Sequence, residues 1–181
     1  YASVGSALSQ TIADLEVFVI GDGVPDITRE IVRDLQRDSR VHFFDNPKGE
    51  RTGEQWRHQP IAEAAQGEIV CYLSDDDIYL PDHVAAMSEA LKTADFVHAP
   101  PLTVEGEEFT VCACDLTDSV TAELVSELQF YRFGLSHVAH TLDFYRRLPF
   151  GWRTTPAGIP TDQYMWQQCL TIPGIRTGST F

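Results

Sequence analysis

One stretch restricts the possible folds most: a short apolar run that ends in three adjacent acids. The run covers residues 68–73, and Ser74 separates it from Asp75, Asp76 and Asp77. Such a run is typical of a strand buried on both faces, as in a parallel sheet. Open α/β sheets bind ligands at the carboxyl ends of their strands, where these acids fall. Adjacent carboxylates repel each other, so we expect a hard divalent cation such as Mg²⁺ or Mn²⁺ here; a solvated acidic turn is the alternative.

Strand-like and helix-like segments alternate through the rest of the chain. We expect strands over 15–20, 40–44, 68–73 and 95–98, a hairpin that joins 102–104 to 109–114, and an extended piece over 136–140. We expect helices over 1–11, 26–36, 54–65, 81–91, 120–128, 142–148 and 162–170, with a loop over 149–160. The expected helix starts use Asp26 or Thr28 as a cap, Pro81 in the first turn and Thr161 as a cap. This alternation predicts an α/β fold with a mostly parallel, Rossmann-like sheet flanked by helices.

Charge and cysteine content narrow the function classes. The 181 residues carry a net charge of −14, which argues against binding the nucleic-acid backbone. No stretch is long and apolar enough to cross a membrane, although peripheral membrane association is compatible with the sequence. The four cysteines show no zinc-binding spacing, so we interpret them as reduced core thiols of a cytoplasmic protein.

Four motifs occur in an order that is familiar from one enzyme family. They are Ser9-Gln10-Thr11 through Asp22-Gly23, Trp56-Arg57-His58-Gln59-Pro60-Ile61, Gly67-Glu68 through Asp75-Asp76-Asp77 with Pro81, and Thr161-Asp162-Gln163-Tyr164-Met165-Trp166. In turn they resemble D-D-G-S, A-R-N-x-A-I, G-E-x-I-x-F-L-D-x-D-D and E-D-x-D-L-W of the family 2 glycosyltransferases, which have the GT-A fold. Residues 1–95 match well and 96–160 only loosely. The sequence departs at Gly21, His58 and Thr161, and it starts after the strand with which the family usually begins.

The resemblance implies one GT-A domain over 1–181, with a nucleotide-sugar-binding half over 1–95 and an acceptor-binding half over 96–181. It implies that Asp77 binds the metal, and that Asp75 contacts the metal, its water or the ribose. Asp76 is expected to be oriented by backbone N–H groups within the nucleotide-sugar site. One of the three acids serving only as a helix cap is the alternative.

Three further residues take roles from the resemblance, each with a structural alternative. Arg57 is expected to contact the diphosphate, and a surface ion pair with Glu54 or Glu63 is its alternative. Asp22 is expected at the nucleobase, or else as an Asx-turn residue. Asp162 is expected to be the general base, or else a first-turn acid that answers the helix dipole.

Two tryptophans and two histidines have both a functional and a structural interpretation. Trp152 and Trp166 are candidates for stacking on a sugar, although large aromatics usually pack in cores. His137 and His140 are candidates for a further metal ligand, and we retain His140; a structural histidine is the alternative.

The resemblance predicts a metal-dependent, inverting hexosyltransferase that moves a sugar from a nucleotide-diphosphate sugar, most simply a UDP-sugar, to an acceptor hydroxyl. The cofactor is expected to be Mn²⁺ or Mg²⁺, and the acceptor is undefined. One alternative is a Mg²⁺-dependent nucleotidyltransferase or phosphohydrolase. A nucleotidyltransferase would need a glycine-rich phosphate-binding loop, and none is visible in the sequence. The other is a non-catalytic module that binds sugar nucleotides.

Overall fold

The computed structural model describes residues 1–127 and 134–180. Its strands are β1 (Val17–Asp22), β2 (Val41–Asn46), β3 (Ile69–Cys71), β4 (Phe96–His98), β5 (Leu102–Glu105), β6 (Glu108–Val111), β7 (Val138–Thr141) and β8 (Thr177–Ser179). Its α-helices are α1 (Ala2–Leu8), α2 (Asp26–Leu35), α3 (His83–Ala90), α4 (Ser119–Ser126), α5 (Leu142–Arg146) and α6 (Thr161–Leu170). Three short helical turns are η1 (Glu54–Arg57), η2 (Pro60–Ala64) and η3 (Leu135–His137).

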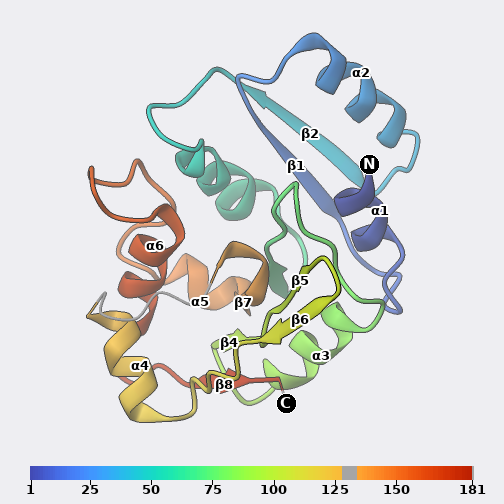
Figure 1. The fold of residues 1–181 in the computed structure, drawn as a ribbon. Helices are drawn as coiled ribbons and strands as arrows, with labels where there is room; N and C mark the ends of the chain where they lie inside the picture. The colour runs from blue at the N-terminus through green and yellow to red at the C-terminus, as the bar shows by residue number, and fades with distance from the viewer. Residues whose placement is uncertain (128–133, 181) are drawn as a thin grey trace.

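The strands form three groups. β1 and β2 pair in parallel, with Val17 opposite Val41. The larger sheet has the order β3-β7-β4-β8, in which β7 runs antiparallel to both neighbours and β8 runs parallel to β4. The predicted α/β class is confirmed, and β8 is an addition that the sequence pattern did not reveal. Figure 1 shows β1, β2 and α2 on one side of the molecule and α4 and α6 on the other, with η1 and η2 between them.

Most predicted helices form, but one breaks. The expected helix over 54–65 is instead the 3₁₀ turn η1 followed by the π turn η2. Pro60 explains the break, because it lacks the N–H that a continuous helix needs and its ring clashes with the preceding turn. The predicted helix end at Leu128 lies outside the described residues.

The predicted helix starts are also corrected. The residues that precede α2 and α6 are Pro25 and Pro160, in extended conformation, and neither helix has a side-chain cap. Thr161 lies inside α6, and its hydroxyl accepts a hydrogen bond from Thr52 Oγ1 at 3.3 Å. Helix α3 starts at His83, two residues after Pro81.

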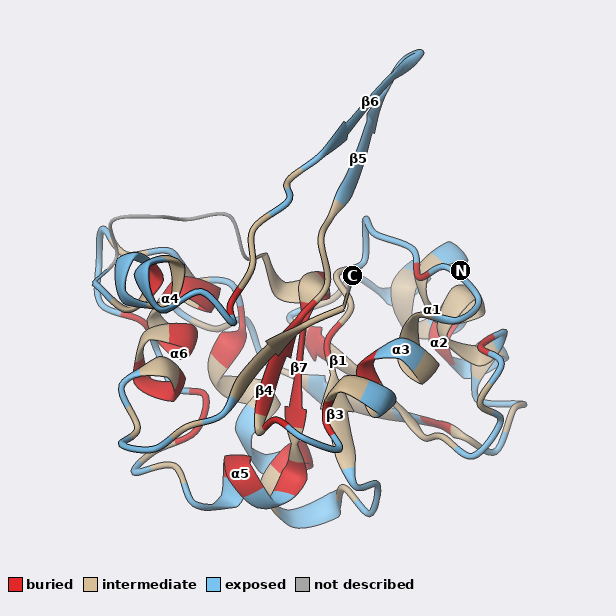
Figure 2. Cartoon of the chain, turned by 90° about the horizontal axis from the view of Figure 1, so that it is seen from below, coloured by how far each residue is buried: buried red, intermediate tan, exposed pale blue. Residues whose placement is uncertain are grey.

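The main core lies between the larger sheet and helices α4, α5 and α6. Trp152 and Trp166 both belong to it, 3% and 1% exposed, so they pack as core residues and are not open to a sugar. Figure 2 shows β4 and β7 buried and the β5–β6 hairpin projecting from the body. That predicted hairpin is confirmed, with Leu102 opposite Val111. In the described part of the chain, no helix is long and apolar enough to span a membrane.

Candidate functional site

The acid triplet follows β3 in a tight turn, in which Asp77 N donates to Ser74 O at 3.4 Å. Ser136, just before the neighbouring strand β7, fixes this turn: its hydroxyl donates to Asp77 Oδ2 at 2.6 Å and accepts from Ser74 N at 2.9 Å. Asp75 and Asp76 are exposed, and neither side chain bonds to any residue of 1–127 or 134–180. The expected backbone orientation of Asp76 is therefore absent. Asp77 is held in place, while Asp75 and Asp76 remain open to solvent.

Asp22 ends β1 and organises the loop over 47–53. Its Oδ1 accepts from Gly49 N at 2.6 Å and from Trp56 Nε1 at 3.2 Å, and its Oδ2 pairs with Lys48. Burial alone would raise the pKa of Asp22, but the hydrogen bonds from Lys48, Gly49 and Trp56 outweigh it and bring the pKa below 3.8. These partners are distant in sequence, so Asp22 is not a local Asx-turn residue. It is an ionised group that shapes a loop beside the end of the strand.

Arg57 is a half-buried arginine without a carboxylate partner. Its guanidinium lies 4.6 Å from the centre of the Trp152 ring. Within the described residues it makes no hydrogen bond or ion pair, so the alternative pairing with Glu54 or Glu63 is not present. Guanidinium N–H groups that lack a protein acceptor in a half-buried position suit a planar anionic ligand.

Several of the predicted site residues lie close enough to Arg57 to affect its pKa. Burial lowers the pKa of Arg57 from its ordinary value of 12.5, and the negative charges of Glu54, Asp162 and Asp22 act on it in the opposite direction. Asp22 ends β1 and Asp162 lies in the first turn of α6, so Arg57 is near residues from both halves of the chain. An anion at Arg57 would lie among several carboxylates, and this favours a ligand that brings a compensating cation.

Glu54 ties this loop to the loop over 149–160. Its carboxylate is fully buried, accepting from Thr155 N at 2.8 Å and from Thr52 N and Oγ1 at 3.0 and 3.2 Å. Burial raises the pKa of Glu54, but the backbone donors outweigh burial, so the pKa lies below 4.5. Arg51 adds bonds of 2.7–3.2 Å to the carbonyls of Thr155, Pro156 and Ile159. The two loops are thus fastened to each other next to α6.

Asp162 lies in the first turn of α6 and is 9% exposed. Its Oδ1 accepts from Gln163 N at 2.9 Å. Burial lowers the pKa of His137, while the charges of Asp77 and Asp162 oppose that shift, so both acids lie near this ring. Because Gly134 N donates to His137 Nδ1 at 3.1 Å, the neutral ring carries its proton on Nε2. His137 is therefore a hydrogen-bond donor near the acids at both ends of the site.

His140 does not fit the predicted role of metal ligand. It is fully buried in β7, and its Nδ1 donates to Thr141 O at 2.9 Å. Its Nε2 lone pair accepts from the Tyr72 hydroxyl at 2.7 Å, and Tyr72 in turn accepts from Trp152 Nε1 at 3.0 Å. Burial lowers the pKa of His140 to about 4, so the ring is neutral. With both nitrogens occupied, His140 is structural, and we leave it out of the proposed metal set.

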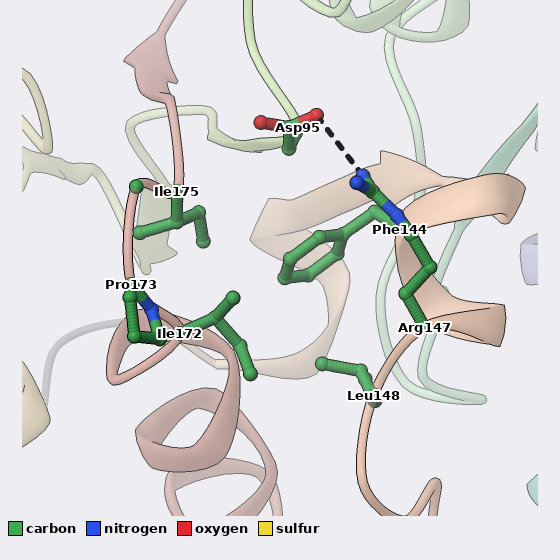
Figure 3. Close-up of a pocket in the computed structure, with 8 residues that line it drawn as sticks. Asp95, Phe144, Arg147, Leu148, Ile172, Pro173 and Ile175 are labelled. Carbon is green, nitrogen blue, oxygen red and sulfur yellow. Dashed lines mark ion pairs between the residues drawn. The ribbon is translucent and has the colours of Figure 1, made fainter.

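A separate cavity lies at the other end of the larger sheet. It has a volume of about 80 Å³ and is lined by apolar side chains such as Phe144, Ile172 and Ile175. Arg147 crosses its rim to pair with Asp95 at 3.6 Å (Figure 3). Asp95 precedes β4, whereas the acid triplet follows β3, and both strands run antiparallel to β7. The cavity therefore lies at the opposite edge of the sheet from the candidate site.

The side chains around the acid triplet decide whether the predicted cation could bind there. Within residues 1–127 and 134–180, no three His, Cys, Asp or Glu side chains form a group that could hold a metal ion. Mg²⁺ usually binds through one or two carboxylates together with waters and substrate phosphates, and does not need a cage made only of protein. Asp77 keeps one oxygen free of Ser136, and Asp75 is exposed beside it. These residues fit an ion that binds together with a phosphate ligand.

Three contributing residues received no site role from the sequence patterns. Glu54, Trp56 and Ser136 act through partners far away in the chain, such as Glu54 with Thr155 at a separation of 101 residues. His137 was a candidate, but nothing in the pattern distinguished it from His140. Trp56 was part of the motif around Arg57, but the motif gave it no role of its own.

The fold and the site define an α/β protein with an acidic turn after β3 and an arginine, Arg57, that has no hydrogen bond or ion pair among the described residues. The profile described as Glycosyl transferase family 2 matches residues 1–116 of the 181, so the chain belongs to that family and has the GT-A fold.

Several curated proteins are similar to the chain. An uncharacterized glycosyltransferase of Nostoc sp. is 29% identical over 98 residues, which cover 52% of this chain and 29% of that protein. The chondroitin synthase of Pasteurella multocida is 35% identical over 91 residues, covering 49% of this chain and 9% of the synthase. The GalNAc(5)-diNAcBac-PP-undecaprenol beta-1,3-glucosyltransferase of Campylobacter jejuni is 30% identical over 88 residues, covering 48% and 28% respectively. The chain therefore spans less than a third of the length of each of these relatives.

Proposed function

We propose that this chain transfers a sugar from a nucleotide-diphosphate sugar to an acceptor hydroxyl, with inversion at the anomeric carbon. Family membership supports sugar transfer in general. The observation that carries the finer proposal is Arg57, whose half-buried guanidinium has no acceptor in residues 1–127 or 134–180. A diphosphate offers the oxygens that a guanidinium binds in a bidentate manner. We therefore assign the donor diphosphate to Arg57.

The cation is part of the same proposal. Asp77, fixed by Ser136, would hold Mn²⁺ or Mg²⁺, with Asp75 contacting the ion, its water or the ribose and Asp76 close to the nucleotide sugar. When bound, such an ion stabilises as a Lewis acid the charge that grows on the leaving phosphate oxygens. The carboxylates around Arg57 make a compensating cation favourable for any bound diphosphate.

Asp162 is the proposed general base. As the acceptor oxygen attacks the anomeric carbon, its proton passes to the Asp162 carboxylate. The bond from that carbon to the phosphate oxygen breaks, and the nucleoside diphosphate leaves with its electron pair. Attack from the face opposite the leaving group inverts the configuration. The Nε2–H of His137 is oriented by Gly134 N and is available to hold Asp162 or an acceptor oxygen.

The remaining assignments follow from this arrangement. We propose Asp22 as the group nearest the nucleobase, with residues 1–95 binding the donor and 96–181 the acceptor. A UDP-sugar is the donor to test first. Two relatives are named for chondroitin and for a lipid-linked saccharide, so we propose a saccharide hydroxyl as the acceptor. We also propose a cytoplasmic location, where cysteine thiols stay reduced.

The experiment that tests this function separates binding from turnover. UDP release from a panel of UDP-sugars is measured with saccharide acceptors and Mn²⁺. Asp162→Asn should bind UDP like the wild type and lose transfer by about 10²–10⁴-fold, because removal of a general base costs that much. The matched control is Asp143→Asn, since Asp143 is an exposed acid in the first turn of α5.

Two outcomes would contradict the assignment. If Asp162→Asn keeps its transfer rate and loses only about 0.3–1 kcal/mol of stability, Asp162 is a helix-dipole residue. If the wild type binds UDP with Mn²⁺ and releases none from any UDP-sugar in the panel, the chain acts as a binding module.

A further inference from the structure

Two cysteines lie together where the β5–β6 hairpin joins the body. Cys112 and Cys114 follow directly after β6, and their Sγ atoms are 3.0 Å apart. Cys114 N donates to Cys112 O at 3.0 Å, which closes a tight turn around Ala113 and brings the two residues closer than extended chain would. Both residues are half-buried, and Cys114 packs against the main core, so the expectation of core thiols is wrong for Cys112 only.

The other two cysteines differ from this pair in their surroundings. Cys169 is fully buried in α6, and burial raises the pKa of its thiol. Cys71 ends β3 and packs against the cluster around Met87, where burial raises its pKa to about 12. Because the thiolate is the reactive form, these two cysteines react slowly in the folded state. Cys112 and Cys114 are set apart from them by geometry, because their Sγ atoms are 3.0 Å from each other.

We propose that Cys112 and Cys114 form a reversible intrachain disulfide, a redox site separate from the sugar-transfer site. Fully extended residues i and i+2 are about 7 Å apart at Cα, the upper limit of a disulfide, and the turn around Ala113 shortens this distance. The sulfurs already approach each other across the turn, so the bond needs only a small adjustment of side chains. In a reducing compartment, cysteine pairs more often exchange disulfides and sense redox state than form permanent structural bonds.

The reaction balances with a low-molecular-weight disulfide such as oxidised glutathione as the oxidant. One cysteine thiolate attacks a glutathione sulfur, which forms a mixed disulfide and releases one glutathione. The second cysteine thiolate attacks the protein sulfur of that mixed disulfide and releases the other glutathione. The protein loses two electrons and its two thiol protons, and the two glutathione sulfurs gain them as thiols.

The position of the pair gives the bond a structural consequence. The hairpin on one side is exposed, with Phe109 at 70%. On the other side the chain is anchored to β8, since Leu116 N donates to Ser179 Oγ at 2.9 Å and Thr177 Oγ1 donates to Leu116 O at 2.7 Å. The disulfide would therefore restrict the backbone of the segment that links the projecting hairpin to the body of the protein.

The test uses the full chain in buffers of stepped reduced-to-oxidised glutathione ratio, quenched with acid, alkylated after denaturation and weighed intact. The wild type should pass to a species that is lighter by two hydrogens, carries no glutathione and has two alkylatable thiols left. Peptide mapping should place the bond between Cys112 and Cys114. Cys112→Ser and Cys114→Ser should each accumulate one glutathione adduct instead.

The wild-type measurement needs no variant to fold, so the proposal stays falsifiable by mass alone. Glutathione adducts on the wild type without an internal bond at any ratio would overturn it. So would a bond to Cys71 or Cys169, or four alkylatable thiols throughout the series. None of these readouts depends on sugar transfer, so failure here leaves the proposed function untouched.

Discussion

Replacing Glu54 by alanine should destabilise the protein strongly, although Glu54 was not a predicted site residue. Its buried carboxylate accepts hydrogen bonds from Thr155 N and Thr52 N, in loops that are far apart in the sequence. Leaving the buried N–H of Thr155 without an acceptor costs about 1–3 kcal/mol, whereas Thr52 is exposed and its N–H can bond to water instead. In a chain of this size each kcal/mol shifts the melting temperature by about 2–4 °C, which predicts a fall of roughly 2–12 °C.

Thermal unfolding followed by circular dichroism at pH 7 measures this effect. The matched control is Glu63→Ala, because Glu63 is exposed and accepts a hydrogen bond only from the nearby Gln59, at 3.1 Å. Surface changes of that kind stay within about 0.5 kcal/mol. If Glu54→Ala melts within about 2 °C of Glu63→Ala, the two loops are not held together by Glu54.

The same prediction has a pH dependence with a definite sign. The pKa of Glu54 in the folded protein lies below the ordinary value of 4.5. Its ionised form therefore contributes stability that is fully present above pH 4.5 and is lost as the pH falls through the folded value. The gap in melting temperature between wild type and Glu54→Ala should narrow in acid; a gap that stays constant down to pH 3 would contradict the assignment.

Two further changes address the site itself. Gly53→Ala should lower both stability and affinity for UDP, because Gly53 has φ +71° and an added Cβ would lie 2.5 Å from the Asp22 side chain; Gly158→Ala, at φ +84° with nothing within 4 Å, should lower stability alone. Equal UDP binding by the two variants, measured by calorimetry, would separate Asp22 from the nucleotide. Asp77→Asn should abolish Mn²⁺-dependent binding of UDP, whereas the exposed neighbour change Asp82→Asn should keep it; unchanged metal dependence in Asp77→Asn would remove Asp77 from the metal site.

The sequence was informative where local periodicity decides the structure. Helix α2 and the β5–β6 hairpin formed close to the predicted residues, because the apolar spacing and the Gly106 turn are local signals. The helix predicted over 54–65 failed because Pro60 and the long-range bonds of Glu54 outweigh helical spacing.

The finer site geometry depended on contacts that no local pattern contains. His140 and His137 look alike in the sequence, yet one is enclosed by Tyr72 and Thr141 and the other lies near Asp77. The antiparallel course of β7 and the presence of β8 depend likewise on pairing across the whole chain. The family motifs nevertheless pointed to Asp22, Arg57, Asp77 and Asp162, whose charges or hydrogen bonds connect them in the fold.

The most direct test of the account is the affinity of Arg57→Ala for UDP and for uridine, measured by calorimetry with Mn²⁺. Hydrogen bonds to charged groups contribute about 1.5–3 kcal/mol, so UDP affinity should fall roughly 10–150-fold while uridine affinity changes little. The control is Arg153→Ala, whose exposed guanidinium lies 3.3 Å from the centre of the Phe150 ring and should not affect either ligand. Equal losses for UDP and uridine, or no loss for UDP, would contradict the placement of the diphosphate at Arg57.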